Sequence, residues 1–129
     1  MKRNLKKNGF ICENFIDEAI SSATTFEEVV DVVNAIENPE MLQKKRKEIL
    51  LRKLIKFSTT YEDVDLVKNY AEGLHYSLTD KQSCLLIEKL VKASITKYQL
   101  KKVKDYARSK GKLSRYMKEL FKKNMAEFN

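Results

Sequence analysis

The chain has 129 residues, a formal net charge of +8 and 43% hydrophobic residues, which is enough to build a globular core and excludes a disordered basic tail. Only three glycines and one proline occur, which disfavours the many tight turns of a β-sandwich or β-barrel and favours an all-α fold. No apolar run approaches the roughly 18 residues of a membrane span. The basic start, Met1–Lys7, is followed by Glu13 and Asp17, so we expect neither a signal peptide nor a membrane partner.

Helix starts are marked along the chain by threonines. A threonine hydroxyl, with an acid or amide three residues later, satisfies backbone N–H groups that the first helical turn leaves without partners. The four threonines that fit are Thr25, Thr60, Thr79 and Thr96. Pro39 indicates a fifth start, because proline at the first helical position lacks a donor that would have no partner there.

Apolar residues spaced three and four apart complete the prediction of seven helices. In chain order the predicted helices cover residues 10–21, 26–36, 39–57, 61–72, 80–93, 97–110 and 113–127. A basic N-terminal segment, residues 1–9, precedes them.

Two of these helices are copied 36 residues later in the chain. Residues 67–71 read Val-Lys-Asn-Tyr-Ala and residues 103–107 read Val-Lys-Asp-Tyr-Ala, while 49–56 aligns with 85–92 at the same offset. Copies at a fixed period indicate stacked supersecondary units. The helix at 10–21 takes the place of the second helix of a missing first unit.

The repeat predicts a single helical-repeat domain over residues 10–129. Its parts are a half-unit at 10–21 and hairpins at 25–57, 60–93 and 96–127. Short loops make neighbouring helices antiparallel, and hairpins that bury their apolar stripes against the next unit form a short right-handed α-solenoid.

Over roughly residues 10–128, this pattern resembles the broad class of helical-hairpin repeat proteins, which includes tetratricopeptide, pentatricopeptide and HEAT-like proteins. The resemblance is one of architecture. The tetratricopeptide pattern has a tryptophan and a Leu-Gly pair in its first helix, and this chain has neither. The resemblance therefore implies stacked hairpins and no particular activity.

Charge is unevenly distributed along the chain. Residues 10–43 carry eight acids and no Lys or Arg, whereas residues 97–129 carry eleven cations and three acids. Seven of these cations form stripes on the last two predicted helices, because they are spaced three and four residues apart. They are Lys97, Lys101, Lys104, Arg108, Arg115, Lys118 and Lys122.

Two interpretations of these stripes are open. They are either the solvated outer faces of amphipathic helices or a binding surface, since like charges four residues apart repel and few acids lie nearby in sequence to relieve them. The second interpretation predicts a non-enzymatic interaction module, an adaptor or inhibitor, that binds an acidic protein through the seven cations. Nucleic acid is the alternative partner, with phosphates in place of carboxylates.

A helix-turn-helix-like hairpin at residues 97–123 would suit the nucleic-acid alternative. Ala107, Gly111, Met117 and Leu120 match the small, turn and apolar positions of that motif. The turn glycine is flanked by lysines where the motif has an apolar residue on at least one side. A repeat hairpin with Gly111 as a helix C-cap explains the same residues.

Catalytic chemistry has no visible basis in this sequence. The two cysteines, Cys12 and Cys84, are 72 residues apart without a CxxC spacing, and His75 is the only histidine. We interpret the cysteines as small buried hydrophobic residues, with a disulfide or metal site as the alternative, and expect a reducing, cytoplasmic setting. The prediction is therefore no enzyme activity, no catalytic residues, no metal, no cofactor and no small-molecule substrate.

Overall fold

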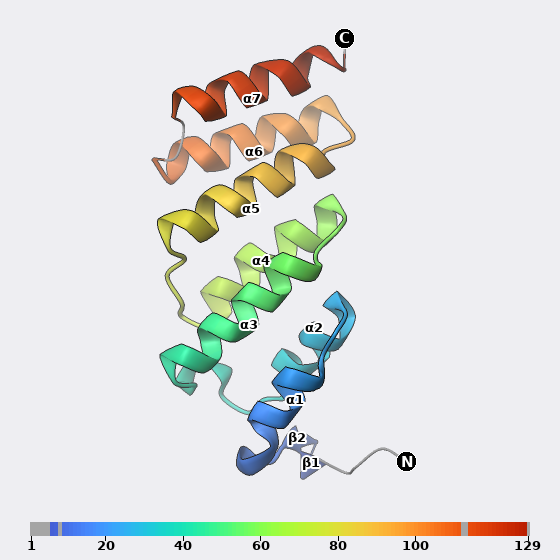
Figure 1. Ribbon diagram of the computed structural model, residues 1–129, viewed down its shortest axis with the longest axis vertical. Helices are drawn as coiled ribbons and strands as arrows, with labels where there is room; N and C mark the ends of the chain where they lie inside the picture. Colours follow the sequence, from blue (N-terminus) through green and yellow to red (C-terminus); the bar gives the residue numbers. More distant parts are fainter. Residues whose placement is uncertain (1–5, 8, 112–113, 129) are drawn as a thin grey trace. The chain divides into compact units, whose positions relative to one another are not determined.

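The computed structural model describes residues 6–7, 9–111 and 114–128, and these residues are predominantly helical (Figure 1). Within them lie seven α-helices: α1 (Ile16–Ser22), α2 (Phe26–Asn34), α3 (Lys44–Phe57), α4 (Tyr61–Gly73), α5 (Asp80–Ala93), α6 (Lys97–Ser109) and α7 (Arg115–Ala126). The predicted all-α class is confirmed. The handedness of hairpin stacking stays a prediction.

Short elements surround the first helices. Strands β1 (Lys6–Lys7) and β2 (Phe10–Ile11) pair antiparallel, and two 3-10 helices, η1 (Glu13–Phe15) and η2 (Pro39–Met41), precede α1 and α3. Lys2, Arg3 and Leu113, which belong to the predicted basic segment and to the predicted last helix, lie outside the described residues. None of the helices in the described ranges combines the length and apolar composition needed to cross a bilayer.

The predicted threonine caps explain where four helices begin. The hydroxyls of Thr25, Thr60, Thr79 and Thr96 each accept a hydrogen bond, 3.1 Å long, from the backbone N–H three residues later. At Thr79 the box is complete, since the Gln82 side chain accepts from the Thr79 backbone N–H at 2.9 Å. Ser114, which was not among the predicted caps, caps α7 in the same way.

Two predicted helices were wrong in extent. Residues 10–21 begin with β2, which pairs with β1 around Gly9 at φ 83°, so the helix starts only at Ile16. Residues 39–57 do not form one helix, because Pro39 begins only the single turn η2, and Leu42 and Gln43 then take extended backbone angles before Lys44. The proline removes a backbone donor, but it does not by itself propagate a helix.

The chain forms two compact units, the first made of residues up to 58 with 66–77 and the second of 59–65 with 78 onward. In the first unit α1, α2 and α3 are in mutual contact. Helix α2 buries Phe26, Val29 and Val33, and α3 buries Leu50, Leu51, Leu54 and Ile55, so that these stripes form the core. Assignment of residues 10–129 to one domain stays a prediction.

Two cations of α3 hold the N-terminal elements of the first unit. Lys53 Nζ donates to the backbone oxygens of Ile20 at 2.7 Å, Ala23 at 2.9 Å and Ser21 at 3.3 Å, at the C-terminal end of α1. Arg46 donates to carboxylates that lie in η1 and α1. Both side chains are therefore structural.

In the second unit α5, α6 and α7 are in mutual contact. Figure 1 shows α6 and α7 lying side by side and running in opposite directions. The buried apolar residues of α5, α6 and α7 form the core of this unit; they are Leu86, Ile87, Leu90, Val91, Leu100, Val103, Ala107, Met117 and Phe121.

The sequence repeat is also a repeat of burial. Leu50, Leu51, Leu54 and Ile55 are at most 2% exposed, and their counterparts 36 residues later, Leu86, Ile87, Leu90 and Val91, are at most 1% exposed. Val67 and Ala71 match Val103 and Ala107 in the same way. The copied residues are therefore buried in both copies.

Candidate binding site between α6 and α7

Helix α6 has one buried and one solvated side. Thr96 begins the helix, and Leu100, Val103 and Ala107 fix its rotation by facing the core. Lys97, Lys101 and Arg108 are consequently exposed and Lys104 is half-buried. These four cations therefore lie away from the buried side of α6.

Burial of apolar side chains also fixes the rotation of α7. Ser114 caps its first turn, and Met117 and Phe121, four residues apart, are each only 2% exposed. This burial leaves Arg115, Lys118 and Lys122 in solvent.

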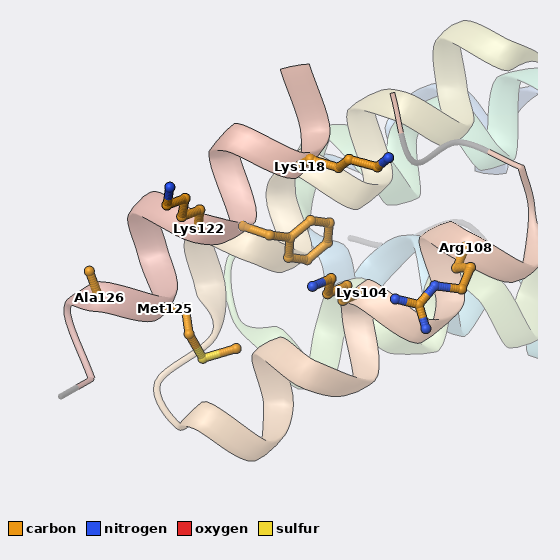
Figure 2. Close-up of a pocket in the computed structure, with 7 residues that line it drawn as sticks. Lys104, Arg108, Lys118, Lys122, Met125 and Ala126 are labelled. Atoms are coloured by element: carbon orange, nitrogen blue, oxygen red, sulfur yellow. The ribbon is translucent and has the colours of Figure 1, made fainter. Parts of the chain in front are cut away.

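A pocket of about 570 Å³ lies between these two helices, in the range typical of ligand sites. Its cationic lining consists of Lys104 and Arg108 from α6 and Lys118 and Lys122 from α7. Figure 2 shows the four side chains arranged along the two helices, with Met125 extending from α7 toward α6. The structure thus brings together four of the seven cations predicted from sequence.

The other three predicted residues, Lys97, Lys101 and Arg115, do not line this pocket. Lys97 and Lys101 occupy the first half of α6, one or two turns before Lys104. Arg115 lies in the first turn of α7, where its side chain is 95% exposed and approaches Glu119 at 3.7 Å.

The apolar floor of the pocket was not predicted from the sequence. It consists of Phe121, Met125 and Ala126. Because Phe121 is 2% exposed, Met125 and Ala126 supply most of its accessible apolar surface, together with the aliphatic stems of the lysines. The spacing did carry a signal, since Met117, Phe121 and Met125 form one apolar row in steps of four, and Met125 is its half-buried end.

The pocket carries uncompensated positive charge. Arg108 approaches Asp105 at 3.9 Å, and both side chains are about two-thirds exposed, which makes this a weak pair. Within the described part of the chain, Lys104, Lys118 and Lys122 form no ion pair. A negatively charged ligand would relieve the repulsion among these cations.

Two cations of a further basic run in α3, Lys44–Lys47, are held by contacts within the fold. Arg46 donates to Glu13 at 2.8 Å and to Asp17 at 3.0 Å, and these hydrogen bonds, the one to Asp17 above all, raise the pKa of Arg46. Lys47 is 9% exposed and donates to the Glu40 carbonyl at 2.6 Å. These two cations are therefore unavailable to a partner.

The tyrosines near basic residues divide into two groups. Tyr70 and Tyr106, which occupy equivalent repeat positions, are half-buried, whereas Tyr98 and Tyr116 are 70% and 58% exposed. Lys102 Nζ lies 5.4 Å from the centre of the Tyr98 ring, so this ring already has a cation over its face. Neither exposed ring lines the pocket.

The turn between α6 and α7 begins at Gly111, whose φ of 67° is the left-handed conformation of a helix C-cap. Met117 is buried and Leu120 half-buried, as the packing of a repeat hairpin requires. The helix-turn-helix alternative stays a prediction.

The side chains that line the pocket are either cationic or apolar. Its lining contains no carboxylate, imidazole or thiol that could act as an acid, base or nucleophile. Cys12 and Cys84 are both free and each is partly exposed, so the interpretation of them as buried residues holds only in part. No cluster of three or more His, Cys, Asp or Glu side chains suited to a metal occurs in the described ranges.

No family model, curated protein or solved structure matches this chain. The candidate site is therefore argued only from the geometry and charge of the pocket.

Proposed function

We propose that this protein is a non-enzymatic interaction module, an adaptor or inhibitor, that binds an acidic protein segment between α6 and α7. The observation that carries the proposal is the pocket that joins four cations from two helices around an apolar floor. Solvation of amphipathic helices accounts for the stripes taken singly, but it does not account for their convergence on one pocket.

The apolar floor favours a protein partner over nucleic acid. Phosphates would pair with the lysines and Arg108 but would leave Met125 and Ala126 facing a charged backbone. Single-strand binders also stack bases on aromatic rings, and the exposed Tyr98 and Tyr116 lie outside the pocket. Nucleic-acid binding is accordingly the outcome that the test must separate from the proposal.

Charge pairing alone supplies only weak affinity. Exposed ion pairs contribute about 0.2–1 kcal/mol each, so the four pocket cations together give at most about 4 kcal/mol, which corresponds to a millimolar dissociation constant. Contacts with the apolar floor must provide the remainder of a micromolar affinity.

Charge reversal at the pocket tests the proposal directly. Fluorescence anisotropy would follow binding of a labelled acidic peptide, and separately of labelled single-stranded and duplex DNA of no particular sequence. The native chain is compared with Lys104→Glu/Lys118→Glu/Lys122→Glu. A matched control, Lys44→Glu/Lys45→Glu/Lys81→Glu, makes the same charge change at exposed first-turn positions of α3 and α5, where acids suit the helix dipole.

We expect the native chain and the control to bind the acidic peptide alike, and the pocket variant to bind it at least ten-fold more weakly. Tighter binding of DNA than of peptide, with affinity falling steeply as salt rises, would replace the proposal by the nucleic-acid alternative. Absence of binding to either probe at low salt would eliminate both.

A further inference from the structure

We infer that the bound segment is an acidic amphipathic helix that places a large apolar side chain between α6 and α7. This inference rests on the proposed function and specifies the conformation and anchor of the partner. Three features of the pocket indicate this kind of bound segment: its apolar floor, its two rows of cations and the spacing within each row.

The floor indicates an apolar anchor. Met125 is half-buried and Ala126 exposed, and Figure 2 shows the Met125 side chain extending from α7 toward α6. A methionine side chain is flexible and adapts to apolar groups of different shapes. A volume of about 570 Å³ leaves room for more than one leucine-sized or phenylalanine-sized side chain.

The charges indicate a helix. Lys104 and Arg108 are four residues apart on α6, and Lys118 and Lys122 are four apart on α7, so each row spans about 6 Å along its helix axis. Acids four residues apart on a partner helix have the same spacing. An amphipathic helix can carry such acids on both sides of one apolar stripe, which matches two cationic rows on either side of a floor.

An extended segment fits this arrangement poorly. Successive side chains of a strand point to opposite faces, so acids that alternate with apolar residues point away from the surface that receives the anchors. Such a segment cannot reach both the cations and the floor with neighbouring residues.

Three labelled peptides of equal charge, about 18 residues or five helical turns each, test the inference. The first carries glutamates four apart on both sides of a leucine stripe. In the second every leucine is alanine, which keeps the charge, does not lower helix propensity and removes the anchor. The third has the composition of the first, with leucine and glutamate in strict alternation. Circular dichroism reports helix formation on binding to the full-length chain.

We expect the leucine-stripe peptide to bind at least ten-fold more tightly than the other two and to gain helicity. Met125→Ser should remove this preference for leucine over alanine, while thermal unfolding shows that the variant remains folded. Met41→Ser is the matched control, because Met41 is 79% exposed and lies in the first unit.

The outcomes separate this inference from the proposed function. Equal affinity for the leucine and alanine peptides would refute the anchor and leave binding of an acidic partner intact. Equal affinity for the stripe and alternating peptides would refute the helical conformation. Failure of all three to bind would overturn the proposed function itself.

Discussion

Removal of the Lys53 ammonium group should destabilise the first unit, because three backbone oxygens at the end of α1 accept hydrogen bonds from it. Lys53→Met keeps the aliphatic stem and removes the charge and the donors. A hydrogen bond to a charged group contributes about 1.5–3 kcal/mol. A cation at a helix C-terminus adds about 0.3–1 kcal/mol.

The loss of these stabilising contributions is partly offset, because the methionine side chain recovers apolar contacts and is not held in one geometry. We therefore expect the free energy of unfolding to fall by about 2 kcal/mol, measured by urea denaturation. The amides at the end of α1 should also exchange with solvent faster than in the native chain. Lys45→Met, at an exposed position of the same helix, is the control. A loss within about 0.5 kcal/mol of that control would refute a structural role for Lys53.

Three further predictions test other parts of the fold. Arg46→Ala should lower the free energy of unfolding by about 1 kcal/mol, and by less in high salt, because the two carboxylate partners of Arg46 are mostly exposed. A loss of stability that does not depend on salt would contradict an ionic origin. Gly111→Ala should cost about 1–2 kcal/mol of unfolding free energy because φ is 67°, and Gly111→Asn should cost less; equal costs would argue against backbone strain. Leu86→Ala should lower the free energy of unfolding by about 2–5 kcal/mol. Leu85→Ala, at a position 44% exposed, should lower it by less than half as much in the same denaturation assay, and similar losses for the two variants would contradict the assigned core.

Local sequence signals predicted helix bounds correctly where a local interaction, such as a capping box, determines them. The helix predicted at 80–93 has the observed bounds, because a complete capping box begins it and an apolar stripe continues through Val91. The long helix predicted to start at Pro39 was wrong. Asn38 before the proline is left-handed and Leu42 is extended, and the turn between them has only three residues. Phe10 and Ile11 pair with β1, which no helical period reveals.

The candidate site was predictable in composition and not in geometry. Helical spacing identified Lys104, Arg108, Lys118 and Lys122 as exposed cations, but only the packing of α6 against α7 selects them from the longer stripes. Arg46 shows the opposite case. It belongs to a conspicuous basic run, yet contacts with residues 29 and 33 positions earlier remove it from the free surface. Such long-range pairs depend on tertiary structure.

Chemical-shift mapping of the isotope-labelled chain offers the most direct test of the central claim, that an acidic segment binds between α6 and α7. On titration with the leucine-stripe peptide, the account predicts saturable changes concentrated at Lys104, Arg108, Lys118, Lys122 and Met125. Residues of α1 to α3 should not change. Changes centred on α1 to α3, or no changes at a concentration that saturates the anisotropy signal, would contradict it.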